Sequence, residues 1–241
     1  MIPVWLHALS QAMLALAIVC ALIIVADEIR HPQAMWIMNI VWPVTALFGT
    51  IIWLWAYFRY GRAAIRSVRR KRHDNEASTP HKPFVISVGE GASHCGSGCT
   101  LGDLCAEWLA FFVPAIASWF GWRSIFAEKM YAVWILDYLF AYLFGILFQY
   151  FTIVPMRGLS VRRGIVAAIK ADTLSLTAWQ AGMYGFMAFA SLIIFRSIIG
   201  TELKVDSVEF WFMMQIAMLA GFVTSYPVNW WLIRAGLKEA M

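Results

Sequence analysis

Charged residues are scarce in this 241-residue chain, in which Asp, Glu, Lys and Arg together make up 14% of the sequence. An average soluble domain contains about 25%. Apolar residues account for 61%, and the mean hydropathy is +0.69. One aqueous core cannot bury this much apolar surface. The composition therefore excludes an ordinary soluble domain and predicts an all-α integral membrane protein whose main partner is the lipid bilayer.

Several functional signatures are also missing. The sequence has no Gly-x-x-x-x-Gly-Lys-Ser/Thr nucleotide-binding motif, no phosphorylated-Asp pump motif and no Cys-x-x-Cys-His haem-attachment motif. These absences argue against a primary pump within this chain. The formal net charge of +5 would suit nucleic acid, but the basic residues lie between apolar runs and form no basic face, so we expect no nucleic-acid partner.

Six apolar stretches approach the length of about 20 residues that a membrane-spanning helix needs. The first, which starts the chain, has no basic region before it and no small-residue cleavage site, so it is expected to be a retained span. The six expected spans are residues 4–26, 35–58, 100–120, 130–153, 173–195 and 208–232. The sequence thus predicts a polytopic bundle of about six transmembrane helices.

The distribution of Lys and Arg predicts the orientation of that bundle. With both termini cytoplasmic, fourteen of these residues fall on the inner side and five on the outer side, as the positive-inside rule requires. Arg66 to Arg72 form the most basic run, which we interpret as a topology signal beside anionic lipid. Three regions follow: a two-helix hairpin at 1–58, a basic cytoplasmic linker at 59–93, and a four-helix domain at 94–241.

Residues 89–103 are the most unusual segment because glycines there alternate with possible metal ligands. We expect a loop that ends where Thr100 and Asp103 have capping-box spacing. His94, Cys95 and Cys99, with Asp103, would then form a site for a soft or borderline ion such as copper or zinc. Two alternatives remain open: a thiol-redox pair at a helix N-terminus, and a structural glycine-rich segment with incidental cysteines.

Ionisable side chains inside apolar spans are the second unusual feature. Asp137 begins a polar and small stripe that continues at every fourth residue through Ala141, Gly145 and Gln149, so this face should pack against protein. Asp137 and Glu107 are candidates for a proton or cation relay, and the alternative is a structural carboxylate. Asp172 is expected at a helix start, where the helix dipole favours a carboxylate.

Methionines are spaced four apart in the last two spans, and thioethers can relay Cu(I), although Met is also ordinary core packing. These residues are Met183, Met187, Met214 and Met218.

Four ordered motifs resemble a bacterial membrane family known as domain of unknown function 4396. They are His94-Cys95-Gly96-Ser97-Gly98-Cys99-Thr100-Leu101-Gly102-Asp103, Pro155-Met156-Arg157, Lys170-Ala171-Asp172-Thr173-Leu174-Ser175-Leu176 and Ser225-Tyr226-Pro227-Val228-Asn229-Trp230-Trp231. The resemblance runs from about residue 94 to 235. It implies a multi-pass protein of a bacterial inner membrane, and it implies no activity or ligand.

The residues favour a transition-metal-binding membrane protein, a transporter or handling factor for a soft ion, over an enzyme. Cys95, Cys99 and His94 would capture the ion, and the buried carboxylates would line its path or carry protons. The alternatives are a membrane oxidoreductase with a lipid-soluble partner such as a quinone, and a structural subunit that assembles with other copies or other membrane proteins.

Overall fold

The computed structural model describes residues 1–65 and 83–238, and the elements in those residues are all helices. Five segments are long and apolar enough to cross a membrane, which confirms a helical membrane bundle. The elements are α1 (Val4–Arg30), α2 (Met38–Arg59), η1 (Gly61–Ala64), α4 (Phe84–Phe112), α5 (Ala115–Trp119), α6 (Lys129–Arg157), α7 (Val161–Ala188), its π-helical continuation η2 (Phe189–Ile199) and α8 (Val208–Arg234).

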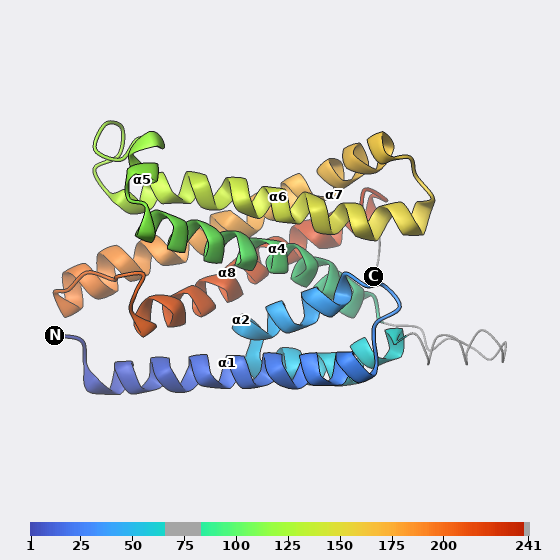
Figure 1. The fold of residues 1–241 in the computed structure, drawn as a ribbon, viewed down its shortest axis with the longest axis horizontal. Helices are drawn as coiled ribbons and strands as arrows, with labels where there is room; N and C mark the ends of the chain where they lie inside the picture. The colour runs from blue at the N-terminus through green and yellow to red at the C-terminus, as the bar shows by residue number, and fades with distance from the viewer. Residues whose placement is uncertain (66–82, 239–241) are drawn as a thin grey trace.

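Helix α4 is the centre of the bundle, packed against α2, α6, α7 and α8 (Figure 1). Its N-terminal half, from Ser87 to Thr100, is buried almost without interruption. Helix α1 lies at the edge, where it contacts α2 and α8 and buries only six of its 27 residues. Helix α4 can lie in the centre although it is polar, because its neighbours shield it from lipid, whereas the apolar α1 can face lipid.

The expected loop at residues 89–103 is wrong, because this segment is part of α4. The helix starts at Phe84, so the expected helix start at Thr100 is wrong, and the boundary between the 59–93 linker and the 94–241 domain falls inside α4. Thr100 caps nothing and instead donates a hydrogen bond to the Gly96 carbonyl, 2.8 Å away. The glycines serve close helix packing, the usual role of small residues between membrane helices.

Helix α2 also differs from expectation, because it folds back on itself at Thr50, where φ is 46° and ψ is −127°. The rings of Trp42 and Tyr57 are 5.6 Å apart, whereas residues 42 and 57 of a straight helix would be about 22 Å apart. Gln215 of α8 donates a hydrogen bond of 2.7 Å to the Leu47 carbonyl at this break. The second apolar stretch is therefore a re-entrant hairpin.

The re-entrant hairpin changes the topology. Both ends of α2 lie at the same end of the bundle, and the N-terminus lies at the opposite end from the C-terminal end of α8 (Figure 1). The segments that run along the bundle are α1, α6, α7 with η2, and α8, which are four of the five apolar segments, together with the more polar α4, which is not one of them. The expectation of two termini on one side is thus corrected. Arg30 joins Arg157 and Arg234 at the C-terminal end, which increases the basic excess there. The Arg66 to Arg72 run lies outside the described residues.

Candidate functional site

A stripe of reactive side chains runs along one face of α4. Cys95, Cys99, Asp103 and Glu107 follow one another at every fourth residue, and all four are buried. Residues at this spacing lie on one face of a helix, one turn apart. The stripe therefore places two thiols and two carboxyls in a row along the axis of the bundle.

Close contact between α4 and α6 brings this stripe to the buried groups of α6. A Cβ atom added at Gly102 would lie 2.4 Å from the Ala141 backbone nitrogen, and one added at Gly98 would lie 3.0 Å from the Gly145 nitrogen. The two helices therefore touch through their backbones. This contact confirms that the Ala141 and Gly145 face of α6 packs against protein.

Three carboxyl groups gather toward the end of the bundle where α4 ends and α6 begins. Asp137 of α6 interacts electrostatically with Asp103 and Glu107 of α4. Asp103 and Asp137 are each 1% exposed, and among the described residues their oxygens make no hydrogen bond of ordinary geometry. The Gln180 amide of α7 lies beside Asp103. Like charges repel strongly in a low-dielectric interior, so this cluster can be stable only with bound protons or with a cation.

The buried thiols face α7. Cys95 lies beside Cys99 and beside Asp172, which also approaches Gln149 of α6. A Cβ atom on Gly145 would lie 2.2 Å from Asp172 Oδ2, so the glycine makes the space that Asp172 occupies. The expected position of Asp172 at a helix start is wrong, because α7 begins at Val161 and Asp172 lies about three turns inside it.

His94 points away from the thiols, toward α6. Its Nε2 atom lies 3.3 Å from Thr152 Oγ1, and its ring packs edge-on against Phe148. Adjacent residues on a helix are about 100° apart, so Cys95 faces α7 while His94 faces α6. In residues 1–65 and 83–238, no three His, Cys, Asp or Glu side chains are arranged to hold one metal ion. The four proposed ligands are thus not brought together.

The buried groups Glu107, Asp103, Cys99, Cys95 and Asp172 form a row along the bundle that we call the polar line. A lysine lies at the end of this line that is farther from Glu107. Lys238 is 2% exposed, and its ammonium donates hydrogen bonds to the Gly91 carbonyl at 3.0 Å and to Asn229 Oδ1 at 2.7 Å. Asn229 in turn donates to Ser175 Oγ at 2.7 Å. Sequence analysis counted Lys238 only as a topology charge. The four-residue spacing of Ser225 and Asn229, directed into the bundle, was the one available signal of a polar contact here.

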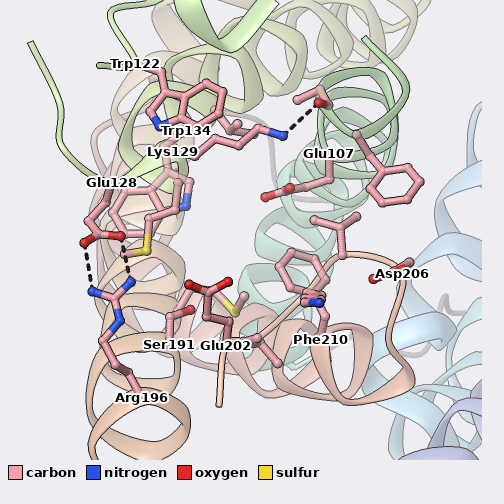
Figure 2. Close-up of a pocket in the computed structure, with 18 of the residues that line it drawn as sticks. Glu107, Trp122, Glu128, Lys129, Trp134, Ser191, Arg196, Glu202, Asp206 and Phe210 are labelled. Carbon is pink, nitrogen blue, oxygen red and sulfur yellow. Dashed lines mark hydrogen bonds and ion pairs between the residues drawn. The ribbon is translucent and has the colours of Figure 1, made fainter. Parts of the chain in front are cut away.

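A large vestibule opens at the N-terminal end of the bundle. Its volume is about 620 Å³, and Figure 2 shows the Glu107 carboxylate pointing into it. Lys129 donates a hydrogen bond to the Ala110 carbonyl beside Glu107, and Arg196 forms two hydrogen bonds with Glu128. These bonds from Arg196 lower the pKa of Glu128, which keeps that pair ionised. Glu107 thus connects the vestibule with the buried carboxyls.

The methionines do not form one continuous stripe. Met187 lines the vestibule, whereas Met214 and Met218 line a separate cavity of about 310 Å³ that Asp103 also reaches. Met183 and the other three methionines all belong to one hydrophobic core cluster. The shared cluster fits ordinary core packing, and the thioether relay stays a prediction.

The same part of the chain carries the family relationship. The sequence profile of one family, described as a domain of unknown function (DUF4396), matches residues 87–238, which include α4, α6, α7 and α8. Neither the curated proteins nor the solved structures contain a match to this chain. The match covers well over half of the sequence and includes every residue of the polar line from Cys95 to Lys238. The chain therefore belongs to the family described as domain of unknown function DUF4396.

Proposed function

We propose that this chain is a secondary membrane transporter in which buried carboxyl groups carry protons. The observation that carries the proposal is the cluster of Asp103, Glu107 and Asp137, buried in the bundle interior and open to the vestibule only through Glu107. On the family resemblance we place it in a bacterial cell membrane.

A purely structural role fits these carboxyls poorly. A structural carboxylate inside a membrane bundle is normally held by a cation or by several hydrogen-bond donors, because an unpaired buried charge is costly. In the described residues, the oxygens of Asp137 have no hydrogen-bond partner, and Asp103 has only the single amide of Gln180 beside it. Groups that bind and release protons need this freedom, since neither protonation state may be locked by a permanent partner.

The polar line continues past the cluster toward the opposite end of the bundle. From Asp103 it passes Cys99, Cys95 and Asp172, and it ends where Lys238 covers the helix ends. In this arrangement the vestibule end is open and the Lys238 end is closed. A transporter that alternates between two open sides would have to move Lys238 to open the second side.

Proton flux in proteoliposomes tests the proposal. Purified protein is reconstituted with a trapped pH-sensitive dye, and a potassium diffusion potential drives protons inward. We expect the internal pH to fall faster than in protein-free liposomes, and Asp137→Asn to return the rate to that of the protein-free liposomes. Glu202→Gln is the matched control, because Glu202 lines the mouth of the vestibule and lies outside the cluster. A wild-type proton flux equal to that of protein-free liposomes would contradict the proposed proton relay through the buried carboxyl groups.

Copper handling remains a second candidate because the two buried thiols lie side by side. Cu(I) is a soft ion that favours thiolate ligands, and two thiolates suffice for linear coordination, so His94 and Asp103 need not be ligands. Elemental analysis of protein purified under reducing conditions tests this role. We expect about one copper per chain in the wild type and none in the Cys95→Ser, Cys99→Ser double variant. Metal-free wild-type protein that takes up no Cu(I) would remove copper from consideration. The same thiol contact would also serve the oxidoreductase alternative, but the thiols lie within α4, away from its N-terminus, where the helix dipole would not activate them.

A further inference from the structure

The inner end of the vestibule carries two opposite charges that do not contact each other. Glu107 is 6% exposed, and its carboxylate points into the vestibule (Figure 2). In the described part of the chain its oxygens have no hydrogen-bond partner, and unlike those of Asp137 they are open to the cavity. The Lys129 ammonium attracts Glu107 but forms no ion pair with it. Both groups can therefore bind a ligand.

The spacing of these two charges suits a small molecule that carries both signs. The Lys129 ammonium donates to the Ala110 carbonyl at 3.0 Å, which uses one of its three N–H groups. Ala110 is three residues after Glu107 on α4, a rise of about 4.5 Å, so Lys129 is held roughly one helical turn from the carboxylate. A charge-assisted hydrogen bond spans only about 2.7–2.9 Å. An α-amino acid can bridge this gap, with its ammonium on Glu107 and its carboxylate on Lys129.

A ligand with a single charge matches this end of the vestibule less well. A cation on Glu107 would lie beside the like charge of Lys129. An anion on Lys129 would face Glu107, with Asp103 and Asp137 next to it. Since like charges that are brought together in a site are costly, a ligand with both charges is the complementary one.

The charges nearer the mouth decide less. Glu128 and Arg196 satisfy each other through two hydrogen bonds. Glu202, Lys204 and Asp206 are exposed, so water and salt screen their charges. Selection by charge therefore falls to Glu107 and Lys129 at the inner end.

The remaining walls of the vestibule are apolar and aromatic. They include Trp122, Trp134, Met187 and Phe210. The indole of Trp134 is fixed by stacking on Tyr184, with ring centroids 4.6 Å apart. A cavity of about 620 Å³ has room for a molecule of amino-acid size, and such walls favour an apolar or aromatic side chain.

We propose that the vestibule binds an amino acid in its zwitterionic form, with an apolar side chain against the aromatic walls. A proton held by Glu107 must leave before the ammonium group arrives, and Asp137 is a neighbouring carboxylate that can accept it. The binding site stands on the vestibule itself. Its role as the substrate site of a proton-coupled transporter rests on the proposed function.

Three probes with the same side chain and different charges test the site. They are L-phenylalanine, which is a zwitterion at neutral pH, the cation 2-phenylethylamine and the anion 3-phenylpropionate. Equilibrium binding to the purified full-length protein is measured with empty micelles subtracted. We expect L-phenylalanine to bind at least roughly tenfold more tightly than either of the other probes, because only it satisfies both charges.

Two variants should change the charge preference in opposite directions. Glu107→Gln should weaken binding of L-phenylalanine by roughly tenfold or more and leave 3-phenylpropionate unchanged or tighter. Lys129→Gln, which keeps an N–H group for the Ala110 carbonyl, should weaken L-phenylalanine similarly and leave 2-phenylethylamine unchanged or tighter. The probe that is retained shows that each variant is folded. Glu202→Gln is the matched control and should bind all three probes as the wild type does, because its charge is screened at the mouth.

Three results would overturn the site: no binding of L-phenylalanine above empty micelles, equal binding of the three probes, or a preference for the zwitterion that survives both variants. The two proposals fail separately. Proton flux without L-phenylalanine binding would reject this site alone, whereas selective binding of L-phenylalanine without proton flux would reject only the transporter proposal.

Discussion

The cysteines differ sharply in their surroundings. Cys20, Cys95 and Cys99 are buried and Cys105 is exposed, and all four are free thiols. The two thiols that sequence analysis placed in an open loop are thus closed off by α7 and by the small residues around them. Any chemistry at Cys95 and Cys99 requires that the bundle opens first.

Thiol labelling measures this closure directly. With N-ethylmaleimide, we expect one reactive thiol per folded chain and four after unfolding in dodecyl sulfate, counted by intact mass. Cys105→Ala should leave the folded protein almost unlabelled. Rapid labelling of Cys95 or Cys99 in that variant would mean that the interior is open and that the polar line is solvated along its length.

At the scale of the element, glycine decides how closely two helices can approach each other. Gly102 meets the α6 backbone, where an added Cβ atom would be 2.4 Å from Ala141 N, whereas nothing lies within 4 Å of a Cβ atom added at Gly185. The same residue type therefore marks a helix contact in α4 and an open surface in α7. Only the first position depends on the absence of a side chain.

A pair of alanine substitutions separates these two uses. Gly102→Ala should destabilise the protein by about 1–3 kcal/mol, because α4 and α6 must move apart. Gly185→Ala removes backbone freedom in a helix and should leave stability unchanged or raise it by up to about 1 kcal/mol. Thermal unfolding in detergent gives both values. A Gly102→Ala protein as stable as the wild type would show that the helices are not in backbone contact.

The sequence patterns predicted which faces of a helix are buried better than they predicted where each helix begins. The stripe from Asp137 to Gln149 was correctly assigned to a buried face, because regular four-residue spacing has one meaning on a helix. The segment around His94 was wrongly assigned, because dense glycine is equally typical of loops and of tight contacts between membrane helices. Nothing local distinguished the two. Asp172 was missed because its helix starts with the polar residues Arg162 and Arg163, which resembled a loop.

At the scale of the whole molecule, the hairpin at Thr50 sets the topology. An apolar run of this length normally crosses a bilayer, and neither Gly49 nor Thr50 is an obvious signal for a reversal. The reversal depends on contacts with distant elements, such as the hydrogen bond from Trp53 to Ser93 and that from Gln215 to Leu47. A composition-based prediction cannot include such contacts.

The reversal has a direct experimental signature. In sealed vesicles and on a background lacking Cys105, we expect Arg30→Cys and Arg59→Cys to react with an impermeant maleimide from the same side. Ser124→Cys, in the connection at the other end of the bundle, should react from the opposite side. If residues 30 and 59 instead react from opposite sides, α2 crosses the membrane and the termini share a side.

The same hairpin constrains how the chain is made. During synthesis the first 65 residues leave the ribosome before Ser93 and Gln215 exist, so the break at Thr50 then has neither of its stabilising partners. A continuous helix satisfies its own backbone and is the better state for that fragment in lipid. The early chain should therefore insert α2 straight and withdraw its second half only when α8 arrives. Maturation would then include a late reversal within the membrane, a step at which an insertase or a slow checkpoint could act.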